Sequence, residues 1–507
     1  MTLALSRRAF LAGAALPLLR IPDARASTPG MLTFGLSSFP PNLQPWANTG
    51  TAAGTIKLIM YRGLLSYDAS GTVRGELAEN WTPEGSTAWL IKLREAVFQD
   101  GEKVTSEAVK WNLEQVAAEK STAYLRAEFQ GVEKIETPDA RTLRIVMKQP
   151  TATLPSWLAS YHLPIVSPRS VSGSNVPVGA GPFALKAQER GVSLEFEAFD
   201  RYYRPGLPKL KRIRAIAYAD ENLRVAALQA GDVDLIEYVP WQAMEAISAD
   251  PKLKLDAVDG PFMYLVFNGT RPPFNDPRVR KAVAHAVKRD EIVKAAFFGR
   301  GSALEHLPIA EQSDFFNADL KNAWRYDAAL AKKLLTEAGH PNGFTCTCLS
   351  TAQYGMHKDT AEVVQQNLAA VGIQVELQVP DWATRVQLGN RGQFQMAVGG
   401  TAADSNDPDG IGNLLDGSLA PSYVRSFGIR VPRIEDLLRA GRGEFDPAKR
   451  KAIYAEMERV AIEEAPMVGL AWRSQGYAMQ KNVAGFTNLP GALSFYSGLT
   501  FEETSVG

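Results

Sequence analysis

The 507-residue chain has little of the chemistry on which most enzymes and metalloproteins depend. It contains 2 cysteines and 5 histidines, and the histidines lie far apart in the sequence. It has no nucleophile-elbow, zinc-protease, C-x-x-C or phosphate-binding-loop motif. A Ser-His-Asp site whose members meet only in the fold stays open as an alternative. The sequence therefore favours a binding protein over an enzyme, and it predicts neither a cofactor nor a metal site.

The chain also lacks an excess of charge of one sign, and it lacks long apolar stretches. Lys+Arg and Asp+Glu number 55 each, so the chain lacks the basic excess that nucleic acid would require. Its longest apolar stretch falls well short of the ~18 residues that a membrane-spanning helix needs. The content of 45% hydrophobic and 22% charged residues is typical of globular proteins. This length predicts two or three domains.

Positive charge gathers at the N-terminus. Residues 1–26 carry four arginines against one aspartate, a net of +3, which leaves −3 for the remainder of the chain. The sequence SRRAFL at residues 6–11 leads into a short apolar stretch, and ARA at residues 24–26 supplies the small residues that signal peptidase requires. The segment resembles a twin-arginine export signal. It predicts cleavage after Ala26 and a periplasmic product, with an ordinary amphipathic helix as the alternative.

The two cysteines, Cys346 and Cys348, are far from the predicted cleavage site. A lipoprotein needs cysteine as its first mature residue, and here that residue is Ser27, so no lipid anchor is expected. Cysteines one residue apart point to the same face of a strand, where a bridge between them would be strained. We interpret them as small apolar side chains in a buried strand. A redox role is the alternative.

Strand-like alternation and helical periodicity are interspersed along the chain. Alternation predicts strands over residues 31–36, 88–93, 142–147, 192–199 and 373–379. Periodicity predicts helices over residues 106–118, 222–230, 276–287, 328–338, 358–371 and 447–464. Asp276 before Pro277 suits a helix start, and Gly339 and Gly372 suit helix ends. The chain is therefore predicted to be mixed α/β with more than one sheet.

One glycine-rich segment formally matches a dinucleotide-binding fingerprint. GAGPFA at residues 179–184 fits G-x-G-x-x-G/A, but that motif works only where its glycines open a helix that faces the pyrophosphate. Here Pro182 follows the second glycine, and residues 192–199 alternate like a strand. We interpret the segment as a tight turn that leads into a strand, with a nucleotide site as the alternative.

Several segments occur in an order and at a spacing that are typical of one protein family. They are LAENW (77–81), LREAVFQDG (93–101), TSEAV (105–109), VGAGPF (178–183), LQAGDVD (228–234), PFNDPRVRKA (273–282) and LLTEAG (334–339). Together they resemble the periplasmic solute-binding proteins of ABC transporters of the large dipeptide-, oligopeptide- and nickel-binding type, extracellular solute-binding protein family 5. The resemblance covers nearly the whole mature chain.

The resemblance implies an α/β, two-lobed periplasmic-binding-protein fold (type II-like) with hinge crossovers and an extra N-terminal subdomain. The first lobe would consist of residues 27–60, 170–262 and 474–507, with an inserted subdomain at 61–169, and the second lobe would be 263–473. The crossovers are expected near 261–268 and 470–474. Ligand would be buried when the lobes close on it.

The resemblance also implies a site in the cleft. Asp404, in TAADSNDP (401–408), matches an acidic residue that pairs with a peptide's N-terminal ammonium in relatives, and Thr401 stands where relatives have tryptophan. Asp404 follows an apolar stretch predicted to be a buried strand, and a turn-capping role is the alternative. The further candidate ligand contacts are Trp46, Tyr264, Trp382 and Tyr423.

One departure from the family affects the expected ligand. Dipeptide-binding relatives place an arginine ahead of the helix at 358–371 to hold the ligand's carboxylate, and residues 349–368 contain no arginine. The expected function is therefore capture of a peptide-like or amine-bearing solute and its delivery to ABC permease subunits in the inner membrane. A monomer that binds no nucleic acid is expected. The alternatives are a twin-arginine-exported periplasmic hydrolase and a nickel- or heme-binding member of the same fold.

Overall fold

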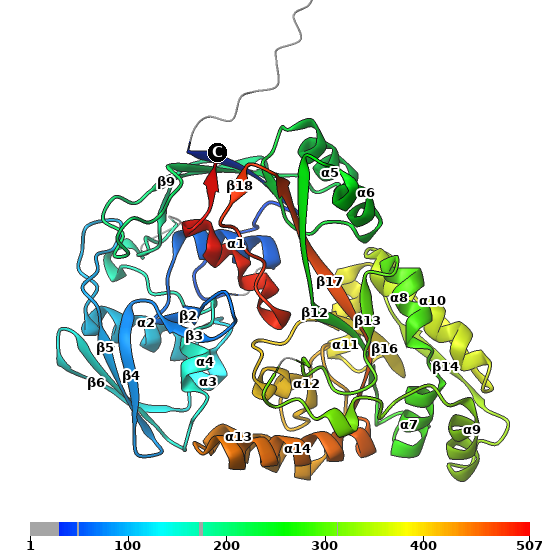
Figure 1. Ribbon diagram of the computed structural model, residues 1–507. Helices are drawn as coiled ribbons and strands as arrows, with labels where there is room; N and C mark the ends of the chain where they lie inside the picture. The colour runs from blue at the N-terminus through cyan, green and yellow to red at the C-terminus, as the bar shows by residue number, and fades with distance from the viewer. Residues whose placement is uncertain (1–29, 48–49, 172–175, 312) are drawn as a thin grey trace, which may run out of the picture.

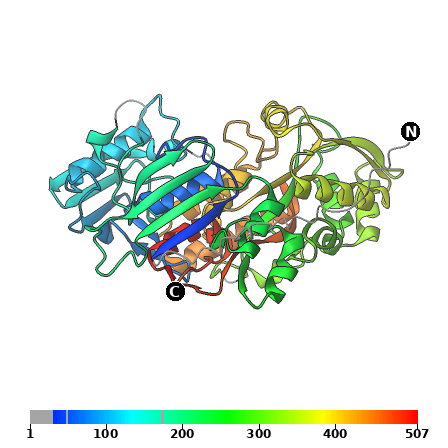
Figure 2. The same cartoon turned by 90° about the horizontal axis from the view of Figure 1, so that it is seen from above.

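The computed structural model describes residues 30–47, 50–171, 176–311 and 313–507 (Figure 1). The predicted export signal, residues 1–26, lies outside the described residues. Within the described part, no helix is long and apolar enough to cross a membrane. The molecule has two lobes, which lie side by side when it is viewed from above (Figure 2).

One large mixed sheet runs through both lobes. Its strands are β1 (Met31–Leu36), β8 (Phe183–Glu189), β9 (Ser193–Ala198), β10 (Arg212–Ala217), β11 (Leu235–Ile236), β12 (Leu253–Phe267), β13 (Gly301–Ala303), β14 (Phe344–Leu349), β15 (Ile373–Gln378), β16 (Met396–Thr401) and β17 (Met467–Gln480). The order is β15-β14-β16-β12-β17-β11-β1-β10-β9-β8, and β13 pairs with β17. We call the part around β1 and β8–β11 the first lobe, and the part around β13–β16 the second lobe.

Two long strands, β12 and β17, belong to both lobes (Figure 1). They pair with each other antiparallel along their length, while β11 joins the end of β17 in the first lobe and β16 joins the end of β12 in the second. Their register shifts between Asp259 and Phe262. These strands contain the predicted crossover segments near 261–268 and 470–474.

The first lobe carries a separate small sheet of order β4-β5-β7-β6. Its strands are β4 (Ala78–Glu84), β5 (Ala88–Leu93), β6 (Val132–Asp139) and β7 (Thr142–Met147), and β2 (Leu65–Tyr67) pairs with β3 (Val73–Gly75) beside it. Every second residue of β7 is buried, because the strand's alternation turns Leu143, Ile145 and Met147 toward one side. That side packs against the apolar face of α2 (Ser106–Ala117).

The remaining helices of the first lobe come from early, middle and late parts of the chain. They are α1 (Thr51–Met60), α3 (Arg126–Phe129), α4 (Leu154–Leu158), α5 (Glu221–Ala230), α6 (Met244–Ala249) and the 3-10 segments η1 (Pro168–Ser170), η2 (Trp241–Ala243) and η5 (Gly491–Glu502). The late segment η5 packs on α1, and β18 (Val483–Ala484) pairs with β19 (Ser505–Val506). The buried Glu502 carboxylate lies 2.9 Å from the Arg62 guanidinium.

The second lobe has its own core, all of whose buried members lie between Phe262 and Ala471. Its helices are α7 (Pro277–Ala286), α8 (Arg289–Phe297), α9 (Ala328–Glu337), α10 (Gly355–Ala369), α11 (Trp382–Asn390), α12 (Gly412–Leu415), α13 (Pro432–Gly443) and α14 (Pro447–Glu464), with the 3-10 segments η3 (Ala318–Leu320) and η4 (Pro408–Ile411). Helices α13 and α14 form the lower edge of the molecule in Figure 1.

The predicted elements are confirmed, with ends that agree within three residues. Asp276 caps α7, and Gly339 and Gly372 adopt φ of +88° and +93°, two and three residues after the last residues of α9 and α10. The largest difference is at α10, which begins at Gly355 rather than at 358. Its first residue is glycine, a poor helix former, so propensity gave no signal for the additional turn.

The glycine-rich segment at 179–184 is a turn, as predicted. β8 begins at Phe183, directly after Pro182. A Cβ atom on Gly181 would lie 2.3 Å from the Met60 carbonyl oxygen, so the glycine is required for close approach of two backbone segments. The dinucleotide-binding alternative fails because a strand, not a helix, follows the glycines.

Cys346 and Cys348 are free and buried in β14. Burial raises the pKa of each thiol to about 12, which keeps the thiols protonated and disfavours the reactive thiolate. The interpretation as small apolar side chains in a buried strand is confirmed.

Candidate ligand-binding site

The loop that follows β16 carries three aspartates with different roles. Asp407 caps η4 through the Asp409 amide and binds Arg450 with both carboxylate oxygens, at 2.5 and 2.8 Å. Asp409 accepts a hydrogen bond from Arg442 Nε at 2.6 Å. Both of these acids are therefore held by arginines of the second lobe, and Asp407 fulfils the turn-capping role. Asp404 faces the other way, toward the first lobe.

Asp404 meets a group of aromatic side chains from the first lobe. Tyr124 donates its hydroxyl proton to Asp404 Oδ1 at 2.7 Å, and Tyr496 donates to the Asp404 carbonyl oxygen at 3.2 Å. The Tyr161 ring lies 4.8 Å from that of Tyr496, and the Tyr67 ring lies 5.4 Å from it. We call Tyr67, Tyr124, Tyr161 and Tyr496 the tyrosine cluster. A second-lobe carboxylate thus stands against a first-lobe aromatic wall.

The electrostatics of this contact leave the carboxylate without a compensating cation. Asp404 keeps an exposed surface, but protein packed around its carboxylate reduces the hydration of that group, and this partial desolvation raises its pKa to about 6. His162 packs on the rings of Tyr124 and Tyr161, at 4.2 and 4.0 Å. Burial, followed by the charge of Lys57, lowers the pKa of His162 to about 3, so its imidazole is neutral. Among the described residues, no lysine or arginine forms an ion pair with Asp404.

Two other predicted site residues lie near this contact. Thr401 ends β16, and its hydroxyl donates to the Ala402 carbonyl oxygen at 3.2 Å. Trp46 is linked to the segment that carries Tyr124. Its indole donates to the Pro164 carbonyl oxygen at 3.1 Å, and its own carbonyl oxygen accepts from the Tyr124 amide at 2.9 Å. Trp46 therefore positions the segment that carries Tyr124.

Trp382 and Tyr423 lie together, with their ring centroids 5.7 Å apart. The Arg385 guanidinium is 5.2 Å from the centre of each ring, a distance suited to cation–π contact. Tyr264 is also nearby, but its side chain is fully buried in the second lobe, where the hydroxyl donates to the Val424 carbonyl oxygen at 2.9 Å. The structure therefore brings the predicted residues into two groups, one around Asp404 and one around Trp382.

Three buried cationic or imidazole side chains in the second group were not predicted as a site. Arg385, His357 and Arg473 are 1%, 1% and 3% exposed. Arg385 comes from α11, His357 from the first turns of α10, and Arg473 from the crossover strand β17. We call them the arginine cluster. Arg385 was not predicted because an arginine was expected within residues 349–368, and Arg385 lies beyond them on α11, the helix that follows β15.

The family model for bacterial extracellular solute-binding proteins, family 5, matches residues 72–421. The chain belongs to this family. The glutathione-binding protein GsiB of Escherichia coli K12 is 28% identical over 479 residues, which are 92% of both chains. The PBP AgaA of A. tumefaciens R10, solved with agropinic acid, is 38% identical, with a TM-score of 0.85 over 94% of this chain and 99% of that one. NikA of Brucella suis, solved with Fe(III)-EDTA, has the same fold at 24% identity, with a TM-score of 0.83 over 94% of this chain and 100% of that one.

Family 5 membership establishes the two-lobed periplasmic-binding-protein fold and an ABC-type solute-binding role, and the chain is not an enzyme. The exported-hydrolase alternative is therefore not supported. For the nickel alternative, the described part of the chain holds no group of three or more His, Cys, Asp or Glu side chains that could bind a metal ion.

A wide-open groove of about 670 Å³ lies elsewhere, on the small-sheet part of the first lobe. It is lined by residues such as Phe98, Lys103, Trp111 and Arg169, and by none of the predicted site residues. Trp46 reaches it only indirectly, through a ring contact with Trp111 at 6.1 Å. The interlobe contact between Asp404 and the tyrosine cluster, which contains predicted residues, is the candidate site.

Proposed function

We propose that this family 5 protein captures a small peptide-like or amine-bearing solute in the periplasm and delivers it to the permease subunits of an ABC importer. It acts as a monomer, and its lobes close around the ligand. The observation that carries this proposal is the Asp404 carboxylate, which meets the tyrosine cluster of the first lobe and has no ion-pair partner among the described residues. A desolvated carboxylate is tolerable when an ammonium or guanidinium meets it, and the ligand supplies that group.

We further propose that the lobes divide at the boundaries expected from the sequence, near residues 262–263 and 473–474. Support comes from the second-lobe core, whose buried members all lie between Phe262 and Ala471. Beyond the two shared strands, the lobes meet at a few small contacts. Asn406 hydrogen-bonds to Pro490 and Ala492, and the Ala152 amide donates to the Arg442 carbonyl oxygen at 2.6 Å. Small contacts of this kind suit a cleft that opens and closes.

The ligands in the names of two relatives agree with a small peptide or opine. GsiB is a glutathione-binding protein, and AgaA was solved with agropinic acid. Glutathione is a tripeptide with a free ammonium group, which is the group that Asp404 would bind. Peptide-type ligands therefore form the first set of compounds to test.

The test compares binding of glutathione and of the dipeptide Met-Leu to the wild type and to Asp404→Asn by calorimetry. Neutralising one member of a desolvated charge pair costs about 2–5 kcal/mol, so affinity should fall at least ~30-fold. Asp200→Asn, at an exposed position of the first lobe, is the charge-matched control and should bind like the wild type. N-acetyl-Met-Leu, which has no ammonium, should bind the wild type poorly.

The wild type and Asp404→Asn should also differ in the pH dependence of their ligand affinity. Since the pKa of Asp404 in the empty protein is about 6, wild-type affinity for an ammonium should be roughly tenfold lower at pH 5 than at pH 7. Asp404→Asn should show no such dependence. The melting temperature of the empty variant should not fall at pH 7, because desolvation already disfavours the ionised carboxylate in the folded protein. A lower melting temperature with unchanged affinity would mean that Asp404 is structural.

We also propose export by the twin-arginine pathway, with cleavage after Ala26. The support is the SRRAFL sequence at residues 6–11 and the ARA sequence at residues 24–26. Replacing both Arg7 and Arg8 by lysine should leave uncleaved precursor in the cytoplasm, as seen in fractionated cells. Arg20→Lys, outside the motif, should be processed normally. Mature periplasmic protein at the normal level in the double variant would refute this route.

A further inference from the structure

The C-terminal end of α13, in the second lobe, lies against the small-sheet part of the first lobe. In Figure 1 these elements meet at the lower left of the molecule, whereas β12 and β17 pass between the lobes nearer its centre. The Ala152 amide of the first lobe donates to the Arg442 carbonyl oxygen at 2.6 Å. A Cβ atom on Gly443 would lie 3.3 Å from Cβ of Pro150. The lobes therefore touch at a point away from the crossover strands.

The backbone at this end of α13 is completed by the opposite lobe. The last four carbonyl groups of a helix have no partner within the helix, and those of Gly441 and Arg442 are among them. The Gly441 carbonyl oxygen accepts from Nε of Arg450, a second-lobe residue, at 2.8 Å. The Arg442 carbonyl oxygen accepts from Ala152 of the first lobe. Separation of the lobes would leave this carbonyl to water.

Phe445, in the loop between α13 and α14, adds an apolar contact. It packs against the hydrophobic core of the first lobe, and its ring lies 5.8 Å from that of Trp89. Trp89 is held by its own lobe, because it is 7% exposed and its indole donates to the Thr151 carbonyl oxygen at 2.9 Å. A second-lobe side chain thus covers a fixed surface of the first lobe, and this burial is lost when the lobes separate.

Charge makes little net difference to this contact. Burial raises the pKa of the Glu128 carboxyl on α3, and across the boundary Arg442 opposes that rise while Asp409 adds to it. Arg442 is itself fixed, since its Nε donates to Asp409 at 2.6 Å. The two second-lobe charges act on Glu128 in opposite directions. Apolar packing and the backbone hydrogen bond therefore hold the two surfaces together.

We propose that Arg442–Phe445, which we call the clasp segment, holds the closed lobes together at the small-sheet part of the first lobe and slows the release of ligand. This inference rests on the proposed function for the closure of the lobes, but it does not depend on which solute is bound. The clasp segment contains none of the predicted ligand contacts. Because each of its contacts is small, the clasp prolongs a closure that the ligand begins.

The first experiment needs no ligand and measures how often the clasp forms. In Pro150→Cys/Gly443→Cys, the two Cβ atoms would be within a few tenths of an ångström of the ~3.5–4.5 Å separation in a disulfide. Oxidised dithiothreitol should cross-link this variant within one chain, and neither single-cysteine variant should form that bond. Cys346 and Cys348 do not compete, because burial keeps their thiols protonated. Small-angle scattering should give a smaller radius of gyration for the cross-linked protein than for the same sample after reduction.

Phe445→Ala tests the contribution of the clasp to closure. In the double-cysteine protein it should slow cross-linking about 2- to 10-fold, because the ring contact that favours the closed state is missing. In the protein without added cysteines it should speed the release of isotope-labelled glutathione or Met-Leu, whichever binds, by a similar factor. Phe298→Ala, at a second-lobe phenylalanine that is 60% exposed, is the matched control and should behave like the wild type in both measurements.

The melting temperature of each empty variant monitors folding, and Phe445→Ala should melt close to the wild type because the empty lobes are mostly apart. The proposal is overturned if the cysteine pair does not cross-link, if the cross-linked and reduced proteins have the same radius of gyration, or if Phe445→Ala cross-links or releases ligand at the wild-type rate. If neither compound binds, the peptide-like ligand of the proposed function is wrong, and the cross-linking rates alone decide the clasp. Normal binding with unchanged cross-linking and release would retain the proposed function and reject the clasp.

Discussion

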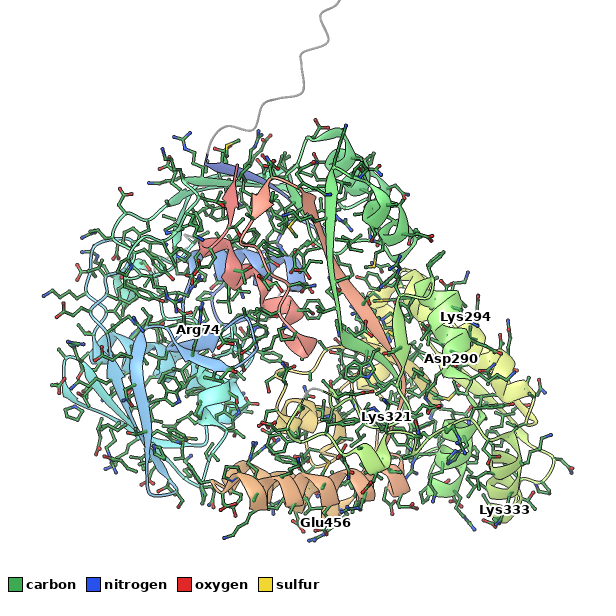
Figure 3. The ribbon with its side chains drawn as sticks, in the orientation of Figure 1. Arg74, Asp290, Lys294, Lys321, Lys333 and Glu456 are labelled. Atoms are coloured by element: carbon green, nitrogen blue, oxygen red, sulfur yellow. The ribbon has the colours of Figure 1, made fainter. Side chains whose placement is uncertain are left out.

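Two glutamates on α14, separated by a single residue, have opposite environments. Glu456 points outward from the lower edge of the molecule (Figure 3) and forms an ion pair with Arg433. Glu458 is 2% exposed, and its Oε2 atom has no hydrogen-bond partner among the described residues. Burial raises the pKa of Glu458 to about 8. Two positions only two residues apart on one helix therefore carry a solvated acid and a protonated, buried one.

Glu458→Gln should stabilise the protein more at pH 8 than at pH 5. The folded-state pKa lies above the ordinary value of 4.5, so the folded protein binds this proton more tightly, and the wild type loses stability as pH rises from about 4.5 through 8. Glutamine carries no proton to lose. We expect a gain of at least about 1 kcal/mol at pH 8 in urea unfolding, and little gain at pH 5.

Glu456→Gln is the matched control on the same helix. Because Glu456 is partly exposed and its ion pair is a surface one, its replacement should change stability by about 0.5 kcal/mol or less. An equal effect of Glu458→Gln at both pH values would show that the Glu458 carboxyl is already ionised in the folded protein at pH 5.

The residue scale also shows what the sequence could predict about the site. Asp404, Trp382 and Tyr423 could be named because a motif or an aromatic side chain marked them. Tyr124 could not, because it lies in no motif and acquires its role from a partner far along the chain. The Tyr124 hydroxyl meets a carboxylate 280 residues away, a distance over which local patterns carry no information.

At the scale of elements, the pairing of the crossover strand β12 with β17 shifts register around one glycine. Gly260 lies within the register shift between Asp259 and Phe262, and a Cβ atom on it would lie 1.9 Å from the Gly491 carbonyl oxygen. Gly491 begins η5, and the next residue, Ala492, donates its amide proton to Asn406 of the second lobe. The close approach at Gly260 therefore links a crossover, a first-lobe segment and a second-lobe loop.

Gly260→Ala should weaken both the fold and the closed state. The added methyl group meets backbone and not a flexible side chain, so Gly491 must move, at a cost of about 1–3 kcal/mol. Displacement of Gly491 also disturbs the Asn406 contacts that join the lobes. We expect a lower melting temperature and weaker ligand binding, measured by calorimetry on the same sample. A variant that melts and binds like the wild type would show that this contact opens without cost.

Element positions were more predictable than element pairing. The alternation in residues 142–147 and the periodicity in 447–464 located β7 and α14, because each element buries one face of its own. The pairing of β12 with β17 brings together segments about 200 residues apart, and only the family resemblance indicated that both would be crossovers. The register and the shift at Asp259 depend on packing in both lobes at once.

For the whole molecule, the lobes are held together by two strands and a few small contacts. Besides the Asp404 and Asn406 hydrogen bonds, the Trp89 and Phe445 rings meet at 5.8 Å. Such contacts contribute little free energy each, since the net value of a hydrogen bond is about 1 kcal/mol. The closed arrangement therefore depends on what a ligand adds between the lobes.

We expect the empty protein to be more open in solution than the structure. Small-angle scattering should give a larger radius of gyration without ligand, and a smaller one with whichever of glutathione or Met-Leu binds in calorimetry. Asp404→Asn at the same ligand concentration should remain in the open form. A compound that binds tightly and leaves the scattering curve unchanged would indicate a rigid pocket.

The first lobe is built from both ends of the described chain, and this arrangement affects synthesis. β1 lies in the same sheet as β11, while η5 packs on α1 and carries Glu502 to Arg62. Tyr496, a member of the tyrosine cluster, is in that late segment. During synthesis, the residues of the second-lobe core (262–471) leave the ribosome before residues 491–502, which complete the wall that faces Asp404. A premature stop before residue 491 would therefore remove Tyr496 from that wall even where the second-lobe core had been translated in full.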